Sequence, residues 1–129
     1  PYLFSNTLAP AIAGASMEVF NILSENTELR DHLEDLTAYY RKGLTEAGFD
    51  IIDSVHPIVP VMLYDEKTAG EFAKRMMDKG VYVVAFSYPV VPKGEARIRV
   101  QLSAAHEQEH LDKAINAFIK VGKELGVIK

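Results

Sequence analysis

The sequence predicts an α+β domain (α/β overall) whose small, mostly antiparallel sheet is covered by helices. Four segments have helical periodicity, and three or four short runs are rich in β-branched and aromatic residues. Their order is helix, helix, strand, strand, helix, strand, strand, helix, which favours a layer of helices packed on one sheet. With 129 residues, 48% of them hydrophobic, the chain is large enough to form one core of its own.

The first predicted helix begins at Thr7, whose hydroxyl is expected to cap it, and runs to about Leu23. Pro10 falls in its first turn, where a missing amide hydrogen is tolerated. The first half is rich in alanine and glycine, whose small side chains let another backbone approach closely. Two interpretations stay open: an ordinary helix of good helix formers, or a helix that packs on something outside this chain.

The second predicted helix begins at Asn26 or Thr27 and ends at Gly48, which suits a left-handed cap. Its apolar residues recur at three- and four-residue spacing, which predicts one buried face. These residues are Leu29, Leu33, Leu36, Tyr40 and Leu44. The other face is charged and includes Arg41, so we expect it to contact solvent.

The central part of the chain predicts two strands and a helix. A short strand is expected at 49–52 and a clearer one at 58–63, which is apolar throughout and therefore expected to be buried on both faces. Pro60 cannot donate to a neighbouring strand, so the second strand should lie at an edge or contain a bulge. Asp65 is expected to cap a helix that stops at Gly80.

The last part predicts two strands around a stiff loop, then a helix. The run 81–86 is β-branched and aromatic, and the loop 87–94 contains two prolines and a glycine. The strand 96–102 alternates strictly, with aliphatic side chains on one face and two arginines and a glutamine on the other. A final helix begins near Glu107.

The two arginines of that strand, Arg97 and Arg99, are the strongest local signal for a binding site. A guanidinium presents a planar fork of donors that matches a carboxylate or a phosphate. An arginine beside a rigid proline loop is therefore a candidate carboxylate clamp. From the spacing alone, an exposed strand face with solvated or ion-paired arginines is the more frequent explanation.

The four histidines favour structural roles. His106 and His110 are four residues apart and could share a helix face as metal ligands, but no carboxylate completes a metal motif, and capping or solvation is favoured. His32 lies among charged helix residues and is expected to be exposed. His56 precedes a proline and is expected to lie in a loop.

Composition excludes several classes of chemistry. The chain has no cysteine, which excludes disulfides and thiolate sites, and its net charge of -4 argues against nucleic-acid partners. No apolar run is long enough for a bilayer and no signal peptide is visible, so no membrane partner is expected. None of the lysines has the setting of a nucleophile, and no phosphate loop or catalytic triad is present.

Three stretches together resemble one known family: Tyr2–Pro10, Phe86–Gly94 and Ala96–His106. In this order and spacing they resemble the C-terminal third of the glycine C-acetyltransferases, a branch of the α-oxoamine synthases. These are pyridoxal-phosphate-dependent transferases of the aspartate-aminotransferase fold. The resemblance extends over essentially the whole chain, and the proline-containing loop is its most specific part.

The resemblance implies a domain division and a set of site residues. Residues 1–24 would be the end of the large-domain or dimer segment with a linking helix, and residues 25–129 the small C-terminal α+β domain. It implies that Arg99 binds the substrate carboxylate, and that Ser5 and Asn6 reach the cofactor phosphate of a partner subunit. No catalytic residue and no metal ligand is expected in this chain, because the family's Schiff-base lysine lies upstream.

The implied reaction condenses glycine with acetyl-CoA to 2-amino-3-oxobutyrate and CoA in threonine breakdown, in a homodimer that binds pyridoxal phosphate. This chain alone is expected to be inactive and to hold no covalent cofactor. The expected location is cytoplasmic in a bacterium and mitochondrial in a eukaryote. Three alternatives remain: another specificity within the same family, a stand-alone domain that senses a carboxylate ligand, and a structural dimerisation module.

Overall fold

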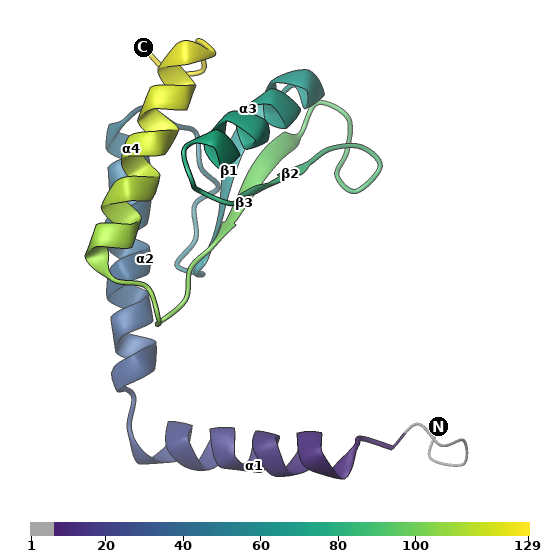
Figure 1. Ribbon diagram of the computed structural model, residues 1–129, viewed down its shortest axis with the longest axis vertical. Helices are drawn as coiled ribbons and strands as arrows, with labels where there is room; N and C mark the ends of the chain where they lie inside the picture. The colour runs from purple at the N-terminus through teal and green to yellow at the C-terminus, as the bar shows by residue number, and fades with distance from the viewer. Residues whose placement is uncertain (1–6) are drawn as a thin grey trace. The chain divides into compact units, whose positions relative to one another are not determined.

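The computed structural model describes residues 7–129 and divides into two compact units, one ending at Asp31 and one running from His32 to Lys129 (Figure 1). The first unit contains α1 (Pro10–Glu25). Its N-cap is Ala9, which makes no side-chain cap, so the prediction that Thr7 caps this helix is wrong.

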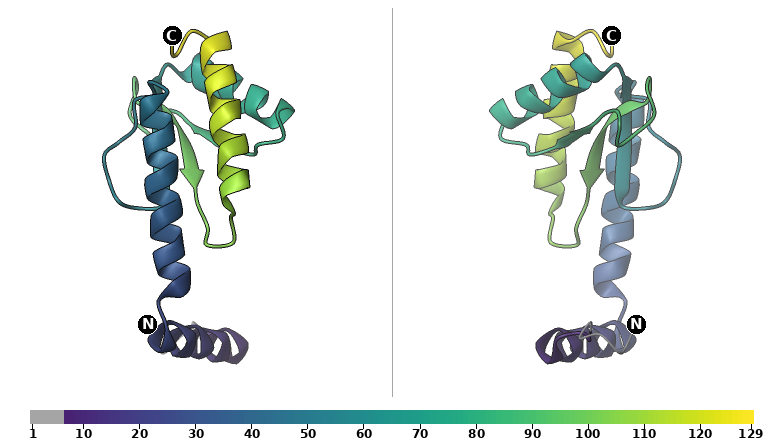
Figure 2. Two further views of the ribbon diagram at one scale, coloured as in Figure 1. Left: turned by 90° about the vertical axis from the view of Figure 1, so that its left-hand side faces the viewer. Right: turned by 90° about the vertical axis from the view of Figure 1, so that its right-hand side faces the viewer.

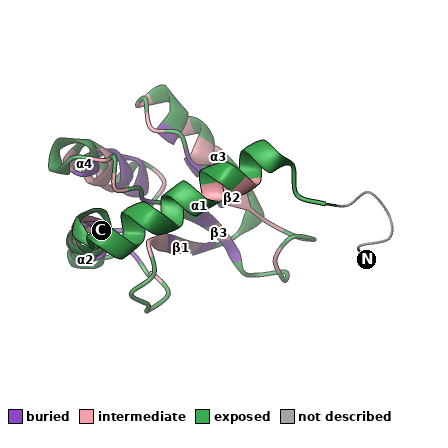
Figure 3. Cartoon of the chain, turned by 90° about the horizontal axis from the view of Figure 1, so that it is seen from below, coloured by how far each residue is buried: buried purple, intermediate pink, exposed green. Residues whose placement is uncertain are grey.

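Helix α1 has no buried residue of its own, as Figure 3 shows by colour. The exposed side chains include Ile12, Met17, Val19, Phe20, Ile22 and Leu23. Phe20 leaves 69% of its surface exposed, which is unusual for a large apolar side chain. The apolar surface of α1 is therefore left without a partner among the residues of its own unit.

The second unit places three helices against a three-stranded antiparallel sheet, which confirms the predicted fold class (Figure 2). The order along the chain is α2 (Glu28–Glu46), of which the part from His32 onward belongs to this unit, β1 (Ile58–Tyr64), α3 (Glu66–Asp78), β2 (Val84–Phe86), β3 (Ala96–Gln101) and α4 (Gln108–Glu124). In the sheet the order is β1-β3-β2, so the last strand of the sequence is the central one.

Two of the predicted strands are shorter in the structure. The segment 49–52 contributes only an isolated bridge from Ile51 to Val61, and the segment 81–86 pairs only from Val84 onward. The prediction for Pro60 is confirmed, because β1 is an edge strand of the three-stranded sheet, with only the isolated bridge of Ile51 on its outer side.

Strand β1 is not buried on both faces as its composition predicts. Burial alternates along it: Val59, Val61 and Leu63 are buried, and the residues between them are half-buried. The reason is that helices cover only one face of this sheet, so a continuous apolar run does not require two covered faces.

Local signals set the helix ends as predicted. Gly48 follows α2 with φ 94°, a left-handed conformation that favours glycine. The carboxylate of Asp65 accepts a hydrogen bond from the amide of Thr68 at 2.8 Å and caps α3. Glu107 and His110 form a reciprocal capping box at the start of α4.

The core between helices and sheet is built around four aromatic rings, Tyr40, Phe49, Phe72 and Phe118. Their centroids are 5.2–6.4 Å apart, and three of the four contacts are edge-to-face. Gly122 of α4 lies against the ring of Phe49: a Cβ placed there would meet the ring at 2.6 Å.

Arg41 contradicts the expectation that the charged face of α2 contacts solvent. Only 9% of its surface is exposed, and its guanidinium donates hydrogen bonds of 2.9 Å each to the carbonyls of Ile52, His56 and Ile58. Burial lowers the pKa of Arg41 from its ordinary value, and Asp53 opposes this effect. Arg41 thus fixes the connection between α2 and β1.

Among residues 7–129 no helix combines the length and the apolar character needed to cross a bilayer. In the same range, no three potential metal-ligating side chains gather in one place.

Candidate functional site

The face of the sheet opposite the helices carries the two arginines of β3. Alternation along β3 directs Ala96 and Ile98 into the core, so Arg97 and Arg99 share the other face, as predicted. Arg97 is half-buried and Arg99 is exposed. Residues of β2 flank them on the same face, because Phe86 pairs with Arg97 and Val84 with Arg99.

The two arginines differ in how much of their donor capacity is already used. Arg97 Nη2 lies 3.2 Å from the carboxylate of Glu95, and its Nε is buried without a partner among the described residues. Arg99 makes no ion pair and no side-chain hydrogen bond within residues 7–129, and its guanidinium carbon lies 4.3 Å from the ring centroid of Phe86. Arg99 is therefore the arginine whose donor fork is free for a ligand.

The loop between β2 and β3 is held by short-range contacts beside this face. The carbonyl of Ser87 accepts hydrogen bonds from the amides of Val90 and Val91 at 2.9 and 3.2 Å. The ammonium group of Lys93 lies 5.0 Å from the ring centroid of Tyr88, within the range of a cation–π contact. These contacts give the loop a defined shape, as its two prolines predict.

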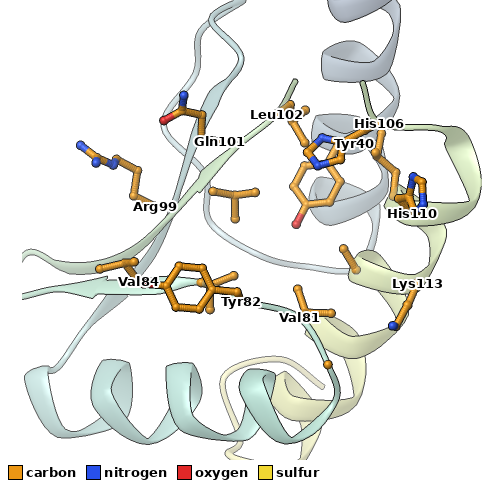
Figure 4. Close-up of a pocket in the computed structure, with 15 residues that line it drawn as sticks. Tyr40, Val81, Tyr82, Val84, Arg99, Gln101, Leu102, His106, His110 and Lys113 are labelled. Carbon is orange, nitrogen blue, oxygen red and sulfur yellow. The ribbon is translucent and has the colours of Figure 1, made fainter. Parts of the chain in front are cut away.

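A cavity of about 470 Å³ opens where β2 and β3 separate (Figure 4). The last paired residues are Val84 and Arg99, beyond which the chain at 81–83 diverges from the end of β3. The walls are mainly apolar, and Tyr40 lines the inner side. Its hydroxyl has no partner among the described residues, and burial raises the pKa of Tyr40 above its ordinary value.

The histidines have structural roles in the described part of the chain. The Nδ1 atoms of His106 and His110 accept hydrogen bonds from the amides of Ser103 and Glu107, at 3.1 and 3.0 Å. The capping interpretation is thereby confirmed for His110, whereas His106 accepts its bond within the turn that precedes α4.

The other two histidines also contact the backbone. His56 Nδ1 accepts a hydrogen bond from the amide of Ile58 at 3.1 Å, within a loop as predicted. His32 is half-buried and its Nε2 lies 3.2 Å from the carbonyl of His106, so the expectation that it is exposed is wrong. The helix that carries His32 lies beside the turn before α4, which sequence spacing does not reveal.

The lysines of the described residues are all exposed or half-buried. All nine lysines lie within residues 7–129, and none of them is buried, whereas a lysine that forms a Schiff base is activated by desolvation or by neighbouring cations. Ser5 and Asn6, which the family resemblance assigns to the cofactor phosphate, lie outside the described residues. Within the described residues, the candidate binding group is the guanidinium of Arg99, which suits a carboxylate.

Comparison with known proteins places these features in context. The family model described as aminotransferase class I and II matches residues 1–118. The chain is 49% identical to the 2-amino-3-ketobutyrate coenzyme A ligase of Escherichia coli K12, over 99% of this chain and 32% of that protein. It is 43% identical to the mitochondrial human 2-amino-3-ketobutyrate coenzyme A ligase, over 99% of this chain and 30% of that protein.

Another relative carries a different name. The 8-amino-7-oxononanoate synthase of Thermosipho melanesiensis is 46% identical, over 99% of this chain and 33% of that protein. The chain thus spans about a third of the length of these curated relatives.

Solved structures share this fold, and the chain aligns with the C-terminal part of those structures. A serine palmitoyltransferase variant from S. paucimobilis with a bound PLP–myriocin aldimine superposes with a TM-score of 0.89 at 26% identity, over 97% of this chain and 32% of that one. A serine palmitoyltransferase structure with a PLP internal aldimine gives a TM-score of 0.91 at 26% identity, over 97% and 32%.

Proposed function

Because the chain belongs to the class I and II aminotransferase family, we propose that it is the C-terminal part of an acyltransferase that condenses glycine with acetyl-CoA to 2-amino-3-oxobutyrate and CoA. The observation that carries this proposal is the identity of 49% to a 2-amino-3-ketobutyrate coenzyme A ligase along 99% of the chain. In this proposal, the enzyme acts as a homodimer, cytoplasmic in a bacterium and mitochondrial in a eukaryote.

The role proposed for this part of the enzyme is to bind the carboxylate of the amino-acid substrate through Arg99. Support comes from the free donor fork of Arg99, from its exposure on the uncovered face of the sheet, and from the Glu95 carboxylate that already occupies Arg97. Two parallel hydrogen bonds from one guanidinium fix both the position and the plane of a carboxylate. Arg99 would thereby orient the amino-acid substrate.

Pyridoxal phosphate, bound by the rest of the enzyme, would supply the electron sink that the reaction needs. Ser5 and Asn6 are proposed to contact its phosphate in the partner subunit. Residues 1–24 would link the large domain to the small domain of residues 25–129, and the exposed apolar side chains of α1 would pack on the large domain. This chain by itself is then expected to show neither bound-cofactor absorbance nor turnover.

A second specificity within the same family has one observation in its favour, the 46% identity to an 8-amino-7-oxononanoate synthase. The test is the rate of CoA release by the longer enzyme that contains this chain, with glycine and acetyl-CoA compared with other small amino acids and with longer acyl-CoA substrates. The proposal predicts the highest kcat/KM for glycine with acetyl-CoA. A clear preference for a longer acyl-CoA would assign the second specificity instead.

Arg99→Ala tests the proposed role in the same enzyme. Loss of a bidentate contact to a charged group costs about 2–4 kcal/mol, which corresponds to a glycine KM raised roughly 30- to 900-fold. The matched control is Arg75→Ala, which removes an arginine on α3 that pairs with Glu71 and Glu124 on the helical side of the sheet. An unchanged glycine KM in Arg99→Ala would remove Arg99 from the site.

A further inference from the structure

Phe86 and Arg99 lie diagonally across the β2–β3 pair on the same face of the sheet. Phe86 pairs with Arg97 and Val84 pairs with Arg99, so the ring of Phe86 reaches Arg99 across two residues of β3. The guanidinium carbon of Arg99 lies 4.3 Å from the ring centroid. That distance is well within the range of a cation–π contact.

This contact restrains Arg99 without using its hydrogen-bond donors. An aromatic ring attracts the cation through its π-system and carries no carboxylate or carbonyl oxygen, so the contact leaves the donors of Arg99 without an oxygen acceptor. Within residues 7–129 Arg99 has no ion pair and no side-chain hydrogen bond, so the ring is the one specific interaction that orients it. An oriented but unpaired fork is pre-organised for a planar anion.

Phe86 is itself well fixed. It is half-buried, it is the last residue of β2, and the next residue, Ser87, accepts two amide hydrogen bonds from the following turn. Arg97 lies directly opposite Phe86 but has Glu95 as its partner at 3.2 Å. The same strand face thus shows one arginine held by a carboxylate and one held by a ring.

We propose that Phe86 is a positioning residue, whose ring holds the guanidinium of Arg99 in the orientation that receives the carboxylate of the amino-acid substrate. This rests on the proposed function of Arg99. Phe86 contacts no reacting atom, so its removal should weaken substrate binding and leave the chemical step nearly unchanged.

The test is steady-state kinetics of the longer enzyme with Phe86→Leu. The glycine KM should rise roughly 3- to 30-fold, the range of a cation–π contact, while kcat changes less than about twofold. Phe86→Tyr and Phe86→Trp retain a ring and should restore the KM of the parent enzyme. Phe86→Met is the second non-aromatic variant, to be measured if Phe86→Leu does not fold.

Val84→Ala is the matched control, because it shortens an apolar side chain of β2 directly opposite Arg99. It should change the glycine KM less than twofold. A KM raised equally by Val84→Ala and Phe86→Leu would mean that the strand, not the ring, is responsible, and would overturn the inference.

Arg99→Gln separates this inference from the proposed function. If Arg99→Gln leaves the glycine KM unchanged, the proposed role of Arg99 fails. If Arg99→Gln raises KM but Phe86→Leu does not, the role of Arg99 stands and the role of Phe86 fails. If the proposed roles of Arg99 and Phe86 both hold, adding Phe86→Leu to the Arg99→Gln variant should have no further effect on the glycine KM.

Discussion

Two helical glycines should respond to alanine in opposite directions, Gly70 in α3 and Gly122 in α4. Glycine in the interior of a helix is less favourable than alanine by roughly 0.5–1 kcal/mol. A Cβ added at Gly70 meets no atom within 4 Å, so Gly70→Ala should raise the free energy of unfolding by about that amount.

At Gly122 the same Cβ would lie 2.6 Å from Cζ of Phe49 and 3.0 Å from Cγ1 of Ile128. The ring of Phe49 cannot move away freely, because it makes edge-to-face contacts with Phe72 and Phe118 at 6.2 and 5.7 Å. Overpacking of a core costs typically 1–3 kcal/mol, which exceeds the gain in helix propensity. Gly122→Ala should therefore lower the free energy of unfolding by roughly 1–2 kcal/mol.

The measurement is urea unfolding followed by far-ultraviolet circular dichroism, with the slopes compared to check that both variants unfold as the parent does. Gly43→Ala is an informative third variant. Its Cβ would meet Cδ1 of Ile115 at 2.7 Å, the flexible end of a side chain, so its effect should be close to zero. If Gly122→Ala stabilised the chain as much as Gly70→Ala, the close approach of α4 to Phe49 would be refuted.

Three further substitutions test other parts of the fold. Arg41→Met removes three hydrogen bonds from a buried cation to backbone carbonyls and should lower the free energy of unfolding by about 2–4 kcal/mol in urea titration; a loss below about 1 kcal/mol would contradict the role given to Arg41. Tyr40→Phe removes a buried hydroxyl that has no partner among the described residues, so stability should stay equal or rise by up to about 1 kcal/mol, and a clear loss would reveal an unseen partner. The hydrogen bond from the backbone amide of Thr68 lowers the pKa of the Asp65 carboxyl in the folded chain. The stability that the Asp65 carboxylate contributes is therefore present above the pKa of the unfolded chain and is lost as the pH falls below about 4. Melting temperatures of the parent and of Asp65→Asn should therefore converge as the solution is acidified, and a constant difference between them would argue against this cap.

Features with local causes could be predicted from the sequence. The left-handed Gly48, the cap at Asp65 and the alternation of β3 each depend on residues that are neighbours in the chain. The assignment of Arg97 and Arg99 to one strand face has the same origin, since side-chain direction in a strand follows the residue number.

Features that depend on distant segments could not be predicted. Arg41 has a charged side chain on a charged helix face, and only the path of residues 52–58 shows that carbonyls surround it. The contact between Phe86 and Arg99 depends on the register of β2 against β3, which the composition of the two strands does not specify. The sequence does place an aromatic residue, Phe86, shortly before the strand of Arg99, and aromatic and long side chains can reach diagonal neighbours across two paired strands.

The position of β3 at the centre of the sheet bears on how the chain is synthesised. Strands β1 and β2 each pair with β3 and not with one another, and β3 begins at Ala96, so it is synthesised after both of them. Until then the two strands have no partner in this sheet and expose unpaired backbone groups, a state prone to aggregation. A truncation before Ala96 would therefore keep α1, α2 and α3 but leave β1 and β2 without their partner in the sheet, and this part of the chain should be a substrate for chaperones or proteases rather than a folded intermediate.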